Sequence, residues 1–152
     1  MKKLFALAVL SFSITVCLAQ KVTTSNFNLD KNGLAIEGYD PVAYFTANKA
    51  MEGKKEITLV NNGVTYRFAS AKDRELFKAD PEKYLPQYGG WCAYAMGATG
   101  EKVSIDPETF KLVDGKLYLF YNQFFNNTKK SWNKDEANLK AKADANWIKT
   151  NK

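Results

Sequence analysis

Two short turn sequences constrain the fold of this chain more than any other feature. Asn61-Asn62-Gly63 and Asp114-Gly115 each separate two runs rich in apolar and β-branched residues, and these turn residues tolerate the left-handed backbone of a tight hairpin. Over residues 56–69, apolar and polar side chains alternate, so each strand has one apolar face. The second strand around the other turn is apolar on both faces, which predicts a central position in the sheet. We therefore predict two antiparallel hairpins, over 56–69 and 110–121.

Helix signals lie around these hairpins. Ser70, with Asp73 three residues on, predicts the start of a helix, and Pro81 predicts its end. A second short helix is expected over 81–85, and a last one from about residue 133 or 134 to 148. The last helix carries one apolar stripe at helical spacing, formed by Leu139, Ala143 and Trp147. The predicted fold is α+β: a small antiparallel sheet built from two hairpins, covered by short helices and by the C-terminal helix.

The connections carry weaker signals. Asp40 before Pro41 is expected to cap a helical turn. A short strand is expected over 102–105 and a turn over 106–108. Phe124-Phe125, after the second hairpin, is expected to lead into a helical region.

The length and the first residues predict an exported single domain. With 152 residues, 45% of them hydrophobic, the chain is long enough for one real core. A short positive region, an apolar stretch and small residues are typical of a signal peptide over 1–19, and no second such stretch follows that would span a membrane. We expect an extended lead-in over 20–32 and a single domain over 33–152, in the periplasm or outside the cell. Lipoprotein anchoring at Cys17 is disfavoured because Val16 precedes it.

Charge and composition exclude several classes of function. The formal net charge of +6 becomes +4 when Lys2 and Lys3 are removed with the signal. The charges are scattered, with no basic face carrying interleaved aromatics, so we expect no nucleic-acid partner. No histidine occurs in the 152 residues, which excludes Ser-His-Asp and Cys-His catalysis, His-ligated zinc and His-ligated haem.

One stretch, Tyr84–Met96, concentrates the side chains with ligating or reactive chemistry. Gly89 and Gly90 predict a tight turn within it, because residues without a Cβ take positive φ easily and allow close approach of another segment. The residues around this turn form the predicted site, with Cys92 and Met96 as metal ligands and Tyr88, Trp91 and Tyr94 as ligand-binding residues.

Cys92 is the centre of the predicted site. Loss of Cys17 with the signal leaves Cys92 without an intramolecular disulfide partner. A thiolate and a thioether suit Cu(I), and Cys92 and Met96 would share one face of a helix over 91–96. A third ligand would come from Met51, a tyrosine, a second chain in a homodimer, or a small molecule. The expected partner is therefore a copper ion or a small ligand.

Two alternatives remain open beside non-enzymatic binding. Cys92 could serve a thiol enzyme or redox sensor, although the sequence offers no histidine base and no resolving cysteine. The aromatic residues could instead build a structural or interaction domain without a cofactor. No residue is predicted to be catalytic.

Several runs of the chain resemble the YHS domain, namely 38–45, 63–70, 76–77 and 80–85. Further runs resemble the exported YHS-domain proteins of bacteria, namely 88–96, 114–119 and 143–147. The resemblance implies a small domain associated with metal binding. Better-known members carry cysteines at positions that match Ala43 and Ala69 here, so metal binding by this chain would depend on Cys92 instead.

Overall fold

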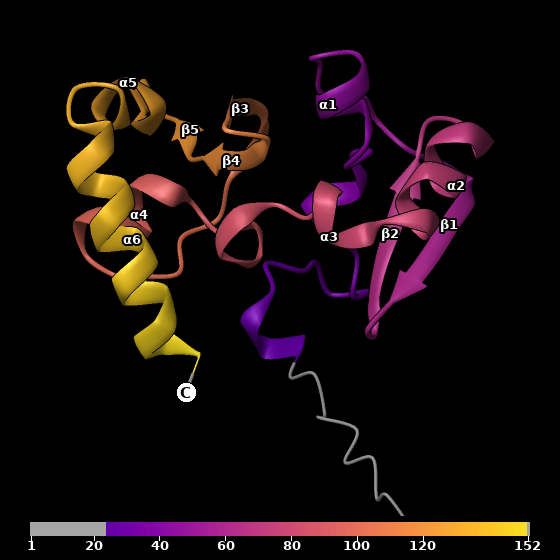
Figure 1. The fold of residues 1–152 in the computed structure, drawn as a ribbon, viewed down its shortest axis with the longest axis horizontal. Coiled ribbons are helices and arrows are strands. Elements are labelled where there is room, and N and C mark those ends of the chain that lie inside the picture. The colour runs from indigo at the N-terminus through magenta and orange to yellow at the C-terminus, as the bar shows by residue number, and fades with distance from the viewer. Residues whose placement is uncertain (1–23, 152) are drawn as a thin grey trace, which may run out of the picture.

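The computed structural model describes residues 24–151. Its elements, with η marking a 3-10 helix, are η1 (Thr24–Asn26), η2 (Ile36–Gly38), α1 (Ala43–Thr46), β1 (Lys54–Asn61), β2 (Val64–Phe68), α2 (Ala71–Ala79), α3 (Pro81–Tyr84), η3 (Gln87–Gly90), α4 (Ala93–Ala98), β3 (Asp106–Val113), β4 (Lys116–Phe120), β5 (Asn122–Gln123), β6 (Asn126–Asn127), α5 (Thr128–Trp132) and α6 (Glu136–Thr150). The β1–β2 hairpin with α2 lies at one end of the molecule and α6 at the other, with β3 and β4 between them (Figure 1).

The strands form three separate two-stranded antiparallel sheets, β1–β2, β3–β4 and β5–β6. The predicted α+β class is confirmed, but the two predicted hairpins do not join into one sheet. Isolated bridges explain the difference, because Leu34 pairs with Thr65 of β2 and Pro86 pairs with Leu117 of β4. These single residues occupy the outer edges of β2 and β4, so the two hairpins do not pair with each other through those edges.

The first hairpin and its helix follow the predicted pattern. Asn61 pairs with Val64 across the turn, and the register continues to Thr58 opposite Arg67. Ser70 caps α2, because its Oγ accepts a hydrogen bond from the Asp73 N–H at 3.1 Å.

The second hairpin begins earlier than predicted. β3 starts at Asp106 and contains a register shift between Asp106 and Phe110, so the expected turn over 106–108 is an irregular part of the strand. Residues 102–105, expected as a strand, have no regular structure. The Val103 carbonyl instead accepts the Cys92 N–H at 2.9 Å, which attaches this segment to the start of α4.

Strand β4 separates two hydrophobic core clusters. Leu117 and Leu119 pack into the first cluster, and Tyr118 and Phe120, on the opposite face, pack into the second. Because successive side chains of a strand point to opposite faces, a strand between two cores must be apolar throughout. The predicted central position in a larger sheet is therefore wrong, because β4 belongs to a two-stranded sheet and its apolar pattern reflects burial on both faces.

The C-terminal helix α6 packs against α4 (Figure 1). The predicted stripe is confirmed, with Leu139 and Ala143 buried and Trp147 packed on the second cluster. Gly97 allows the close contact, because a Cβ at this position would lie 2.5 Å from the Leu139 carbonyl oxygen.

The N-terminal part of the described chain is more structured than an extended lead-in. Residues 24–26 form η1, and Leu29 pairs with Ala35 in an isolated bridge. The predicted signal over 1–19 lies outside the described residues. Within residues 24–151, none of the helices has the length and apolar character that crossing a membrane requires.

Candidate functional site

The predicted glycine turn forms at η3. Tyr88, Gly89 and Gly90 all have positive φ, of 56°, 61° and 84°. The N-terminal segment passes directly against this turn, since the Asn28 N–H donates to the Gly89 carbonyl at 2.9 Å and the Asn28 side chain donates to the Gly90 carbonyl at 3.1 Å. Gly89 is required here because a Cβ would collide with the Asn26 carbonyl oxygen.

Cys92 follows the turn and is fully buried, with 0% of its surface exposed. Its Sγ accepts a hydrogen bond from the Tyr121 N–H at 3.3 Å and lies 3.4 Å from the Thr128 Oγ1. The Thr128 hydroxyl also lies 2.8 Å from the Tyr121 carbonyl, to which it donates. Since a hydroxyl has one proton, the Cys92 S–H must be the donor to Thr128. The network therefore fits a neutral thiol that both donates and accepts.

A pocket of about 420 Å³ is lined in part by Cys92. It lies between α4, the segment 101–103 and the base of the β5–β6 hairpin, and its lining consists of Cys92, Tyr94, Ala95, Ala98, Thr99, Glu101, Val103, Tyr121, Asn126 and Thr128. Most of the lining is apolar or aromatic, and Glu101 contributes the one carboxylate. A concave apolar surface with a few polar groups is typical of a small-molecule site.

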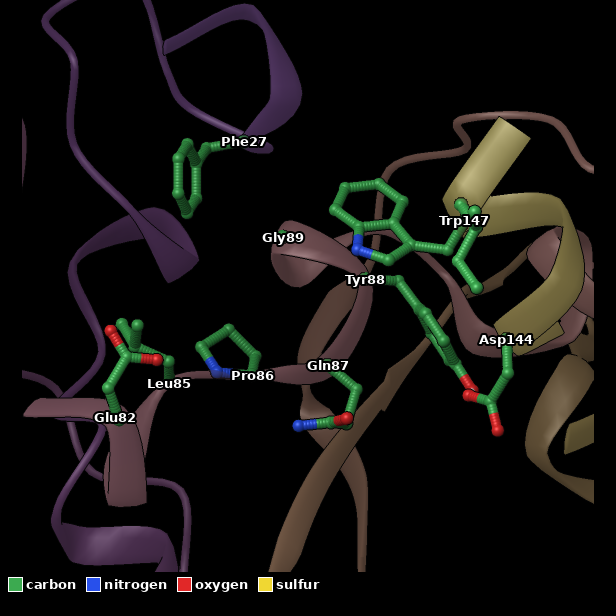
Figure 2. A pocket seen from close by; sticks show the side chains of 10 residues that line it. Phe27, Glu82, Leu85, Pro86, Gln87, Tyr88, Gly89, Asp144 and Trp147 are labelled. Atoms are coloured by element: carbon green, nitrogen blue, oxygen red, sulfur yellow. The ribbon is translucent and has the colours of Figure 1, made fainter. Parts of the chain in front are cut away.

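A second pocket, of about 410 Å³, lies on the other side of the glycine turn (Figure 2). Figure 2 shows the Tyr88 hydroxyl directed at Asp144, to which it donates at 2.8 Å. Lys140 also donates to Asp144, at 2.8 Å. Burial raises the Asp144 pKa, but the hydrogen bonds from Lys140 and Tyr88 outweigh burial and leave the pKa below its ordinary value. Both carboxylate oxygens of Asp144 are thus already paired.

The predicted site residues do not lie in one pocket. Cys92 and Tyr94 line the first pocket, whereas Tyr88 and Gly89 line the second. Trp91 is half-buried and donates its indole N–H to the Asn26 carbonyl at 3.0 Å, so it holds the N-terminal segment.

The two predicted metal ligands pack into different cores. α4 begins at Ala93, with Cys92 in the preceding capping position, so the helix predicted over 91–96 does not include Cys92. Cys92 belongs to the first core cluster and Met96 to the second. Met51, the suggested third ligand, is partly exposed next to Asp40 and does not line the Cys92 pocket. Among residues 24–151, no group of three or more Cys, His, Asp or Glu side chains is arranged to hold a metal ion.

Sequence reasoning did not find the residues that complete the Cys92 pocket. Tyr121 and Thr128 lie 29 and 36 positions after Cys92, at the end of β4 and the start of α5. No spacing in the sequence connects them to Cys92, because the contact depends on how β4 packs against α4. Tyr121 is noticeable only as the last aromatic residue of the apolar run 117–121.

Comparison with known proteins returns no family model, no characterised protein and no solved structure that matches this chain. The resemblance to the YHS domain therefore stays a prediction.

Proposed function

We propose that this chain is a non-enzymatic binding protein whose Cys92 pocket takes a small, largely apolar molecule. The observation that carries the proposal is the open pocket of about 420 Å³ with its mostly apolar and aromatic lining. The signal-like segment 1–19 and the YHS resemblance support a place for this activity in the cell envelope, as predicted from the sequence.

The hydrogen bonds of Cys92 favour binding over thiol chemistry. A thiolate is the reactive form of cysteine, and forming it would remove the S–H donor that now satisfies the Thr128 Oγ1. Thr128 would have to turn its hydroxyl toward the sulfur and abandon the Tyr121 carbonyl. With 0% of Cys92 exposed, an attacking partner would also have to displace a neighbouring side chain.

The proposal can be tested with a variant whose larger side chain fills the Cys92 pocket. Ala98 is an exposed residue of α4 that lines the pocket, so Ala98→Trp should fill the pocket without disturbing either core. The probe is N-phenyl-1-naphthylamine, an uncharged apolar dye that fluoresces when it leaves water. We expect the wild type to bind the dye and Ala98→Trp to bind it at least about tenfold more weakly, because the apolar contacts are lost.

Ala141→Trp is the matched control. Ala141 is also an exposed helical alanine but lies on α6, outside the pocket. It should leave dye affinity unchanged. Equal affinity of the wild type and Ala98→Trp would show that the dye binds elsewhere and would overturn the proposal.

Soft-metal binding at Cys92 is the second candidate, because Cys92 is a pocket-lining thiol and thiolates bind Cu(I). It predicts that a Cu(I) titration under reducing conditions finds one site that Cys92→Ser abolishes. The apolar-ligand proposal predicts instead that Cys92→Ser keeps the dye affinity within about threefold, since the serine hydroxyl replaces the thiol in both hydrogen bonds. The two candidates thus differ in the outcome of a single variant.

A further inference from the structure

Among residues 24–151, the most exposed aromatic side chains lie together at the tip of the β5–β6 hairpin. Phe124 exposes 88% of its reference surface and Phe125 exposes 110%. They form the two-residue turn between Gln123 and Asn126, which pair with each other. The pair itself thus lies in a hairpin turn, and the helical region expected after it is α5, which begins at Thr128. In Figure 1, β5 lies between β4 and α5.

The backbone makes this pair unusual. Phe124 and Phe125 have φ of 50° and 65°, in the left-handed region that bulky residues rarely adopt. The turns of the other two hairpins have nearly the same geometry, with φ of 51° and 79° at Asn62-Gly63 and 51° and 70° at Asp114-Gly115. Those turns use the residue types that suit this backbone. At the third turn the chain accepts strain and exposed apolar surface together, and strain of this kind is concentrated at functional sites.

Hydrogen bonds attach both strands of the β5–β6 hairpin to the rest of the fold. The Asn122 side chain donates to the Thr109 Oγ1 at 2.9 Å and to the Asp106 carboxylate at 3.2 Å, which ties β5 to β3. At the other end of the hairpin, the Thr128 N–H donates to the Tyr121 carbonyl at 3.0 Å.

The residues around the tip match a lipid surface. From Asn122 to Asn127 the only side chains besides the two phenylalanines are amides, so no charged group would have to leave water when the tip is buried. Lys130 and Lys134, which follow in and after α5, are exposed, and the chain as a whole has a net positive charge. Three acidic groups lie near these residues: Asp106 accepts hydrogen bonds from Thr109 and Asn122, Glu101 lines the pocket at the base of the hairpin, and the exposed Asp135 follows Lys134.

We propose that the Phe124-Phe125 tip inserts into the interfacial region of an anionic lipid bilayer, to which the net positive charge of the chain attracts it. Apolar side chains in the interface and basic groups near the headgroups are the two contributions that hold peripheral proteins on membranes. A protein groove would also bury two phenylalanines. The uncharged amides around the tip and the net positive charge of the chain favour the anionic lipid surface.

The test compares sedimentation of the full chain with vesicles of equal parts phosphatidylglycerol and phosphatidylcholine, and with phosphatidylcholine alone. The variant is Phe124→Asn with Phe125→Gly, which copies the turn types of the other hairpins and should therefore fold at least as stably as the wild type. Both proteins share residues 1–23, so a difference between them reports on the tip. We expect the variant to bind anionic vesicles at least about tenfold more weakly than the wild type.

Two further variants test whether binding depends on the tip and whether the tip enters the bilayer. Val60→Ser with Ile148→Ser removes exposed apolar residues elsewhere, of 66% and 63% exposure, and should bind like the wild type. Phe125→Trp should be quenched by brominated phospholipid beyond the quenching of the wild-type tryptophans. Equal binding of the wild type and the tip variant, or no extra quenching, would overturn the proposal. Self-association that depends on the tip, without vesicle binding, would also overturn it and would indicate a second copy of the chain as the partner.

Discussion

Asp40→Ala is expected to destabilise the protein by about 4 kcal/mol, because it leaves several buried backbone donors without a partner. The Asp40 carboxylate is 0% exposed. It accepts hydrogen bonds from the N–H groups of Val42 at 2.8 Å, Ala43 at 3.3 Å and Ala69 at 2.7 Å. The carboxylate thereby joins the start of α1 to the end of β2, two segments that share the first core. Urea denaturation followed by tryptophan fluorescence would measure the loss.

The matched control for this prediction is Asp30→Ala. Asp30 is exposed, and its carboxylate accepts the N–H groups of Asn32 at 2.8 Å and Leu34 at 2.9 Å within a local turn. Water replaces the lost acceptor for much of that turn, so we expect a cost of about 1 kcal/mol. A loss for Asp40→Ala no larger than that for Asp30→Ala would contradict the role given to Asp40.

Gly89→Ala is expected to cost about 3 kcal/mol, through a strained backbone and a steric collision together. Gly89 has φ of 61°, and its added Cβ would collide with the Asn26 carbonyl oxygen and lie 3.0 Å from the Trp147 ring. Relief of the collision would move the N-terminal segment off the turn and break the hydrogen bond from the Asn28 N–H to the Gly89 carbonyl. The free energy of unfolding and the fluorescence of Trp147 would both change.

Gly115→Ala is the control that separates backbone strain from steric collision. Gly115 has φ of 70°, but a Cβ there would have no atom within 4 Å. Only the backbone strain remains, so the expected cost is about 1 kcal/mol. If the two glycine variants lost the same stability, the close approach of the N-terminal segment would contribute nothing and our description of the turn would be wrong.

Much of the local structure could be predicted because its signals are local. The two hairpins, the Ser70 cap and the stripe on α6 each depend on residues within a few positions of one another. Turn geometry, side-chain capping and helical spacing act over such short distances, so the sequence carries them directly. The glycine turn at η3 belongs to the same group.

The arrangement of these parts could not be predicted in the same way. Whether two hairpins share a sheet depends on what packs at their outer edges, and here Leu34 and Pro86, from outside the hairpins, pair with one outer edge of each. Cys92 precedes α4 as its capping residue, and its side chain packs into the first core whereas the Met96 side chain packs into the second. Which core each side chain joins depends on the distant segments packed around α4.

The sequence by itself therefore determined the first two hairpins, the capped helix α2 and the apolar stripe of α6, and it predicted a site around Cys92. Only the tertiary structure decided that Tyr121 and Thr128 would satisfy the thiol, that an apolar pocket would open beside it, and that Phe124-Phe125 would face the solvent. The physical reason is that these outcomes depend on contacts between segments far apart in the chain, whose pairing is set by packing and leaves no periodic signal in the sequence.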